Sequence, residues 1–320
     1  MPLPQAPKLA ALRPLGLFLA FTAVTLVGGA LLAPPLYHLG QWAIAQDLVP
    51  QLRPFHFEKY FNRAVLVLAV ACLLPLLRAL GVRRAAPRLA LPGGHRLLQL
   101  LAGTLIGVLG LFGVALCMVE MGVLHVARWP QAREVALAAV AGAAVGLIEE
   151  CFFRGALFTA LRRTMRWPWA LGVVSLIFAV LHFIGPDPEA GQVTEVTWRS
   201  GLSLLPSLLH AFASPRLLGG TFVTLLLMGL VLGYAVLGSN NLMLALGLHS
   251  GWVFALKLVS KSCVQARVGV WMGDDLRSGL APALMMLLTL ALLAAALRWP
   301  AAGEATAARQ ADDDRPRQAA

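Results

Sequence analysis

Long apolar stretches alternate with short polar connections along most of the chain. A membrane helix needs about 20 mostly apolar residues, within a range of roughly 17–25. Eight stretches reach or approach that length: Leu15–Ala33, Ala64–Leu80, Leu97–Val119, Val135–Leu161, Trp169–Ile184, Gly220–Leu237, Leu242–Val259 and Ala281–Trp299. Pro34 and Pro35 are expected to end the first helix, because proline lacks the amide hydrogen that continues the helical ladder. The pattern predicts an all-α, polytopic membrane protein with about eight transmembrane helices.

The composition supports a membrane environment. Hydrophobic residues make up 59% of the chain and charged residues 13%, whereas a soluble domain carries about a quarter charged residues. The net charge of +11 is spread in short clusters between the apolar stretches. This distribution is typical of membrane topology and not of a nucleic-acid surface. We therefore expect contact with the lipid bilayer and no nucleic-acid partner.

Lys and Arg in the connections predict the orientation. With the N-terminus inside, 14 of the 26 basic residues fall in cytoplasmic segments and 11 in outer ones, which favours an N-in, C-in arrangement. We expect residues 1–300 to form one membrane-embedded domain. Residues 301–320, rich in Ala, Asp, Arg and Gln, are expected to be a disordered cytoplasmic tail. The long connection 185–219 is partly apolar and fits a lid, a substrate gate or a plain surface loop.

Three charged residues interrupt the fourth apolar stretch: Glu149, Glu150 and Arg154. A charge at the bilayer centre costs about 2.5–3.5 kcal/mol, so such residues usually face a cavity or a partner. Glu150 and Arg154 are four residues apart on a helix and can pair. Glu149 lies about 100° around the helix from Glu150 and has no local cation. A carboxyl group in that position suits a general base.

Two other apolar stretches each contain a histidine, His182 and His249. Counted from helix ends that the predicted topology places on one side, Glu149 and both histidines lie roughly 10–20 Å deep, at about 1.5 Å per residue. They can therefore converge. Each histidine taken alone is more simply a buried side chain bonded to a local partner. Several ionisable groups at matching depth favour a site instead, because each adds a cost of burial.

The motifs E-E-x-x-x-R at 149–154 and F-x-x-x-H at 178–182, followed by His249, resemble in order the three motifs of the CPBP family of intramembrane proteases. That family includes the type II CAAX prenyl endopeptidases. The resemblance covers residues 135–259, and the helix count fits the family fold. It implies an intramembrane endopeptidase of the glutamic type.

The resemblance also implies a role for each residue. Glu149 and His182 would polarise a water that attacks the scissile carbonyl group, Glu150 and Arg154 would position Glu149, and His249 would stabilise the oxyanion. Phe178 and Ser250 are expected to line the pocket. Val253 stands where the third motif has a polar residue four positions after the histidine. The oxyanion site is thus one donor short or is completed from elsewhere, with Ser250, Asn240 and Asn241 as candidates.

The implied partner is a membrane protein or lipid-associated peptide substrate. A C-terminal sorting or processing signal is one candidate, because "LHSGWVF" resembles bacterial subfamilies proposed to process such signals. The implied location is the inner (cytoplasmic) membrane. We expect no cofactor and assign no metal ligand; a zinc site is the alternative, since the carboxylates and imidazoles include enough ligands.

Two other classes of function remain open at this point. Ionisable groups inside membrane helices also mark ion paths, so a proton-coupled transporter is an alternative. The change at Val253 also makes a non-catalytic membrane scaffold or immunity protein conceivable.

Overall fold

A computed structural model describes residues 8–81, 94–186, 193, 195–213, 218–266, 276 and 279–297. The expected tail, 301–320, lies outside these residues. The described elements are, in chain order, α1 (Lys8–Ala45), η1 (Pro50–Leu52), α2 (Phe57–Ala79), α3 (Gly94–Glu120), β1 (Leu124–Val126), α4 (Ala132–Glu150), η3 (Cys151–Phe158), α5 (Thr159–Leu161), α6 (Trp167–Leu181), α7 (Ser200–Ser203), η4 (Leu205–Ala213), η5 (Leu218–Phe222), α9 (Val223–Ser239), α10 (Met243–Ser262), β2 (Cys263–Gln265) and α11 (Leu280–Ala296).

The all-α, multi-pass architecture predicted from the sequence is confirmed. Each of the eight predicted stretches contains a helix. In the part of the chain that the structure describes, six helical runs are long and apolar enough to cross a membrane: Leu12–Ala45, Phe57–Ala79, Gly94–Glu120, Ala132–Leu161, Gly220–Ser239 and Met243–Ser262. Helices α6 and α11 are apolar but shorter, at 15 and 17 residues. The predicted count of about eight is therefore approximate.

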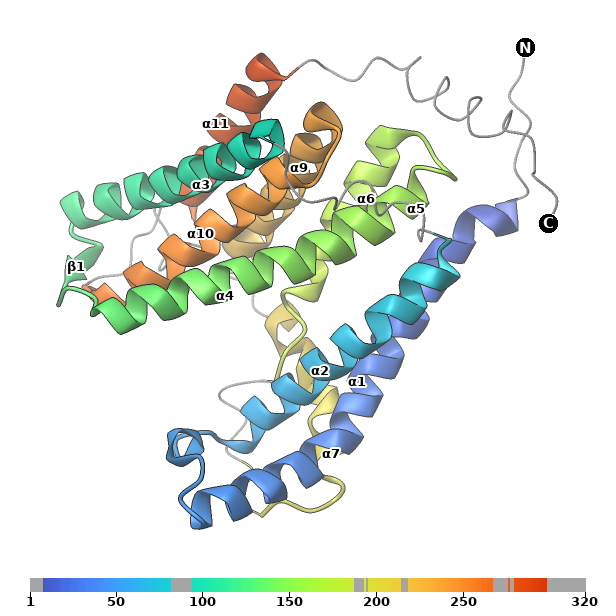
Figure 1. The fold of residues 1–320 in the computed structure, drawn as a ribbon, viewed down its shortest axis with the longest axis vertical. Coiled ribbons are helices and arrows are strands. Elements are labelled where there is room, and N and C mark those ends of the chain that lie inside the picture. The colour runs from blue at the N-terminus through green and yellow to red at the C-terminus, as the bar shows by residue number, and fades with distance from the viewer. Residues whose placement is uncertain are drawn as a thin grey trace.

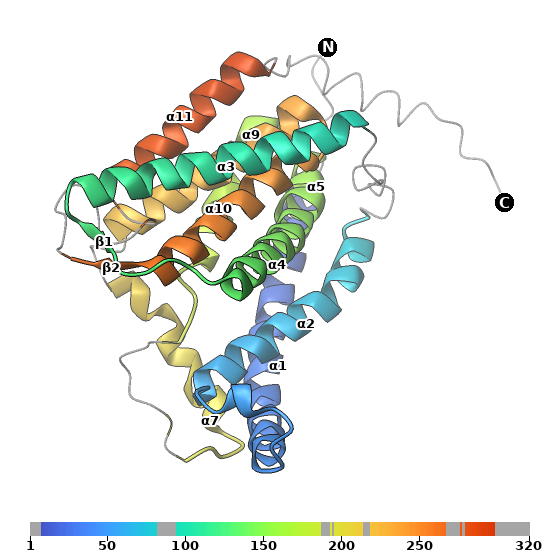
Figure 2. The same cartoon turned by 60° about the vertical axis from the view of Figure 1, so that its left-hand side comes forward.

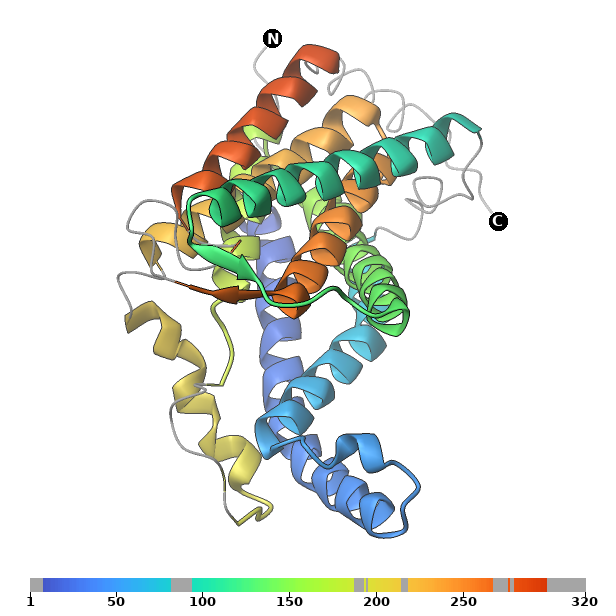
Figure 3. The same ribbon diagram turned by 90° about the vertical axis from the view of Figure 1, so that its left-hand side faces the viewer.

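The helices form two arms that diverge from a shared region (Figures 1 and 3). One arm is the α1–α2 hairpin, with α7 and η4 packed alongside α1. In the other arm, α10 packs against α3, α4 and α9, and α11 packs against α9. A small cluster joins the arms, in which Leu76 and Leu80 pack with Ala156 and Ala160. The residues predicted to be functional belong to the second arm.

A two-stranded antiparallel ribbon, absent from the sequence prediction, joins β1 and β2, with Leu124 opposite Gln265 (Figure 2). It connects the segment between α3 and α4 to the end of α10. The ribbon is short and has no long alternating pattern, which is why the sequence did not reveal it. Its effect is to tie together the ends of three helices.

The prediction that Pro34 and Pro35 end the first helix is wrong. Helix α1 continues through both prolines to Ala45. Proline at position 34 leaves the carbonyl group of Ala30 without its usual helical donor. Gly201 of α7 packs so closely on that carbonyl that a Cβ atom at residue 201 would overlap its oxygen. Prolines are tolerated inside membrane helices more often than inside soluble ones, and here the helix continues with α7 packed closely on this turn.

Glycines bring α3 and α10 into backbone contact. A Cβ atom added at Gly103, Gly107, Gly247 or Gly251 would strike backbone atoms of the facing helix. Small residues at such crossings allow close packing in membranes, where helix association cannot draw on the hydrophobic effect. Because His249 lies between Gly247 and Gly251, this contact fixes its height and rotation relative to the other helices.

The α3–α10 contact gives a testable prediction. At Gly107 a Cβ atom would lie 2.5 Å from the carbonyl oxygen of Leu248, whereas at Gly113 on the same helix it would meet nothing within 4 Å. We expect Gly107→Ala to lower the free energy of unfolding by about 1–3 kcal/mol, because the overpacked helices must separate. The matched control Gly113→Ala should be neutral or stabilising by up to about 1 kcal/mol, since alanine is the better helix former. Denaturant unfolding in detergent measures both, and equal effects would contradict the packing described here.

Candidate active site

The first charged motif lies where the helix type changes. Helix α4 ends at Glu150, and a π-helical segment runs from Cys151 to Phe158. Thr159 donates from its hydroxyl group to the carbonyl oxygen of Arg154, five residues earlier. π-Helical turns are rare and occur often at functional sites. Here the wider turn follows the two glutamates directly and places Arg154 in the interior.

Glu150 and Arg154 form the predicted pair, and both side chains are buried, with 1% of each exposed. Arg154 donates from Nη1 to Oε1 of Glu150 at 2.9 Å and from Nη2 to the carbonyl oxygen of Gly229 at 3.2 Å. Its guanidinium group also lies over the ring of Phe178, 4.7 Å from the centroid. The arginine thus holds the carboxylate of Glu150, the backbone of α9 and an aromatic ring of α6 together.

Glu150 also binds His249. Its Oε1 atom lies 2.9 Å from Nδ1 of His249, which is 2% exposed. A carboxylate only accepts hydrogen bonds, so Nδ1 carries the hydrogen of this contact. This second partner of Glu150 was not predicted from the sequence. The pair Glu150–Arg154 therefore orients the imidazole of α10 through a direct hydrogen bond.

His182 is oriented by its own backbone. The sequence placed it inside a helix, but α6 ends at Leu181 and His182 is the C-cap residue. Its Nδ1 atom lies 2.8 Å from the carbonyl oxygen of Phe178, so Nδ1 carries the hydrogen. Phe178 is fully buried, and its ring packs on the imidazole with centroids 4.4 Å apart. Phe178 therefore packs against the buried side of the imidazole. It does not form the substrate-facing pocket wall that the sequence suggested.

Glu149 meets both imidazoles. Its Oε2 atom lies 3.8 Å from Nε2 of His182 and 3.7 Å from Nε2 of His249. These separations are too long for direct hydrogen bonds and suit one small bridging group. Oε2 itself is buried and has no hydrogen-bond partner among the described residues. The side chains of Glu149 and His182 keep 28% and 33% of their surface exposed, so the cluster has an open side.

The depth argument from the sequence therefore gives the observed convergence. Because both Nδ1 atoms are committed to acceptors, the Nε2 atom of each imidazole is the one that faces Glu149. The cluster thus combines one carboxylate with two imidazole nitrogens that can take part in proton transfer or hydrogen bonding. Such a set can remove a proton from a small polar molecule held between them.

The other predicted residues lie elsewhere. The hydroxyl oxygen of Ser250 faces α4, where a Cβ atom at Gly146 would touch it. Asn241 caps the start of α10: its Oδ1 accepts from the amide of Met243, and its Nδ2 donates to Gln99 and to the backbone of Ser239. Both amide hydrogens of Asn241 are thereby used, which argues against its suggested role as an oxyanion donor.

Within the described part of the chain, no group of three or more His, Cys, Asp or Glu side chains has an arrangement that could hold a metal ion. Glu149, His182 and His249 nevertheless supply the donor types of a common catalytic zinc site, two imidazoles and a carboxylate. A zinc mechanism therefore stays as the alternative to a metal-free one.

A partly exposed carboxylate and two imidazoles, brought together by α4, α10 and the end of α6, define a site suited to acid–base chemistry in a multi-pass membrane protein. Comparison with known families narrows this class. Residues 130–255 match the family described as Type II CAAX prenyl endopeptidase Rce1-like. The match contains Glu149, Glu150, Arg154, His182 and His249. Neither a search of curated proteins nor a search of solved structures found a match.

Proposed function

We propose that the protein is an intramembrane endopeptidase of the glutamic type, in which Glu149 activates a water molecule. One observation carries this proposal: a single carboxylate oxygen lies 3.7 and 3.8 Å from two imidazole nitrogens. A water about 2.8 Å from each of these atoms fits between them with ordinary hydrogen-bond lengths. The match to a protease family supports hydrolysis of a peptide bond as the reaction.

In the proposed reaction the water oxygen attacks the scissile carbonyl carbon, and one of its protons passes to the carboxylate of Glu149. Nε2 of His182 accepts a hydrogen bond from the second proton and so aligns the water. The carbonyl electrons move to the oxygen, which becomes an oxyanion. When the intermediate collapses, the C–N bond breaks and Glu149 returns its proton to the leaving nitrogen. General-base help of this kind is worth about 10²–10⁴-fold in rate.

His249 is proposed to stabilise the oxyanion. Its Nδ1 already donates to Glu150, so donation from Nε2 requires the ring to be the imidazolium. The buried carboxylate of Glu150 is the counter-charge for that form, and Arg154 keeps the carboxylate in place. One such donor is worth about 10²–10³-fold in rate. Val253, one turn further along α10, offers no second donor.

The substrate is proposed to be a membrane protein or a lipid-associated peptide, since the site lies on membrane-spanning helices. A C-terminal processing signal fits the proposal. We also propose that residues 1–300 act as one membrane domain in the inner membrane, with both termini in the cytoplasm. The distribution of Lys and Arg supports this orientation.

Metal dependence separates the glutamic mechanism from a zinc mechanism. We expect purified protein to contain less than one-tenth of a zinc ion per chain. Cleavage should continue at an unchanged rate in a strong chelator such as 1,10-phenanthroline, because Glu149 and His182 activate the proposed nucleophile without a metal ion. Elemental analysis and a chelator titration measure these quantities. Loss of activity in chelator that added zinc restores would show that the cluster holds a metal.

The proposed function is tested by comparing membrane proteomes. Cells that carry the wild-type chain are compared with cells that carry Glu149→Gln at equal membrane abundance. The proposal predicts that one or more membrane precursors remain uncleaved in the variant. Identical proteomes and an unchanged phenotype would favour a non-catalytic scaffold, and substrate-linked proton flux in proteoliposomes would favour a transporter.

A further inference from the structure

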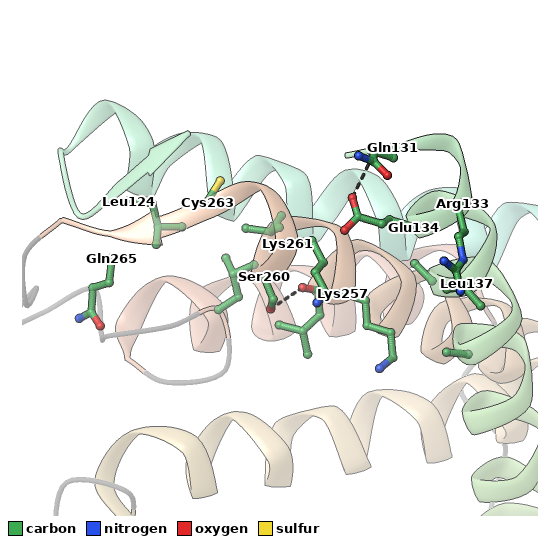
Figure 4. A pocket seen from close by; sticks show the side chains of 15 residues that line it. Leu124, Gln131, Arg133, Glu134, Leu137, Lys257, Ser260, Lys261, Cys263 and Gln265 are labelled. Atoms are coloured by element: carbon green, nitrogen blue, oxygen red, sulfur yellow. Dashed lines mark hydrogen bonds between the residues drawn. The ribbon is translucent and has the colours of Figure 1, made fainter. Parts of the chain in front are cut away.

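A pocket lies at the opposite end of the α4–α10 pair from the π-helical turn. Its volume is about 930 Å³, and its lining comes from the start of α4, the end of α10 and the β1–β2 ribbon (Figure 4). Ligand pockets commonly have volumes of about 300–1,000 Å³. Lys257 is eight residues beyond His249, so the pocket begins about 12 Å along α10 from the candidate active site. It is a separate feature of the molecule.

The lining of this pocket is basic. Arg133 enters from α4, and Lys257 and Lys261 enter from successive turns of α10. All three are exposed, and neither Arg133 nor Lys257 forms an ion pair or side-chain hydrogen bond with a described residue. Glu134 is the one acidic side chain among the described lining residues, and both of its oxygens accept from Arg128, at 2.6 and 2.8 Å. Because that carboxylate is already paired, the pocket carries an excess of positive charge.

The remaining surface of the pocket is largely apolar. Leu137 and Ala141 follow Arg133 down α4, and Leu256 lies beside Lys257 on α10. Arg133 is in the first turn of α4 and Lys261 in the last turn of α10, so the cations lie at the ends of two spanning helices. Basic side chains at such ends lie at the level of the lipid headgroups. The apolar residues continue from there toward the hydrocarbon.

We propose that this pocket binds one anionic phospholipid. Its phosphate group lies among Arg133, Lys257 and Lys261, and its acyl chains lie along Leu137, Ala141 and Leu256. Charge complementarity supports an anionic headgroup, and the apolar surface next to the cations supports a lipid over a soluble anion. Basic pockets between transmembrane helices are known as headgroup sites on the cytoplasmic side. In the proposed N-in, C-in orientation the start of α4 and the end of α10 lie at the outer surface, so the phospholipid here belongs to the outer leaflet. The proposal does not depend on the proposed protease activity.

The test measures lipid binding to the intact protein by native mass spectrometry in detergent. The probes are dioleoylphosphatidylglycerol, dioleoylphosphatidylcholine and inorganic phosphate. The variant Lys257→Gln/Lys261→Gln removes two cations four residues apart on α10. The matched control Lys59→Gln/Arg63→Gln removes two exposed cations with the same spacing on α2. Because each basic residue near the surface contributes about fivefold to affinity, we expect roughly 25-fold weaker phosphatidylglycerol binding in the α10 variant.

The control should change that affinity less than twofold, and Lys257→Arg/Lys261→Arg should retain binding because it keeps the charge. Phosphatidylcholine should bind the wild type at least tenfold more weakly than phosphatidylglycerol. Equal losses in the α10 variant and its control would overturn the proposal. Equal binding of the two lipids, or displacement of phosphatidylglycerol by millimolar inorganic phosphate, would overturn it too.

Discussion

Glu149→Gln is expected to lower kcat for peptide cleavage by at least about 10²–10⁴-fold, because the amide cannot take a proton from water. The same change should alter stability little. The Oε2 atom of Glu149 has no hydrogen-bond partner among the described residues, and glutamine has nearly the same shape. Cleavage rates on an identified substrate, together with thermal unfolding in detergent, measure the two effects separately.

Glu120 offers the matched control for this substitution. It is an exposed glutamate at the end of α3, and Glu120→Gln should leave both kcat and the unfolding temperature unchanged. Undiminished turnover in Glu149→Gln would show that Glu149 is not the general base. If the unfolding temperature of Glu149→Gln dropped sharply, misfolding would explain its loss of activity.

Arg154→Met is expected to have the largest effect on stability. It leaves the carboxylate of Glu150 buried without its cation and removes a donor from the carbonyl group of Gly229. Breaking a buried pair from one side costs about 3–5 kcal/mol. Denaturant unfolding should show a loss of this size. Arg163→Met, at an exposed arginine that donates to the backbone of Gly81, should cost less than about 1 kcal/mol.

A double variant shows whether the unpaired charge causes that loss. Glu150→Leu/Arg154→Met removes both charges and replaces them with apolar side chains. It should recover much of the stability lost in Arg154→Met, because no uncompensated charge remains buried. It should also be inactive, since His249 loses the acceptor of its Nδ1 hydrogen. Equal stability of the single and double variants would show that pairing does not govern the effect.

The all-α architecture and part of the geometry of the candidate site could be predicted from the sequence. The i, i+4 spacing of Glu150 and Arg154 was sufficient to predict their pairing, because that relation is local. The convergence of Glu149 with His182 and His249 followed from depth along predicted helices. That argument needs only the helical rise and a correct assignment of helix ends to one side.

Other features depended on tertiary contacts that a single sequence does not contain. Helix α1 continues through Pro34, where it packs closely on Gly201, a residue distant in the chain. The π-helical segment after Glu150 and the end of α6 at Leu181 have no strong local signal. The contact between Glu150 and His249 depends on how α10 is rotated, and glycine packing against α3 sets that rotation. The G-x-x-x-G spacing at 103–107 and 247–251 is a signal that would have indicated this contact.

The central claim is that Glu149 and His182 act on one water molecule. The most direct test compares kcat/KM for Glu149→Gln, His182→Gln and the double variant on the same substrate. Groups that act as a unit show strongly non-additive losses. The account predicts that the double variant is no less active than Glu149→Gln alone, within about threefold. Losses that multiply, so that the double variant falls by the product of the single effects, would contradict it.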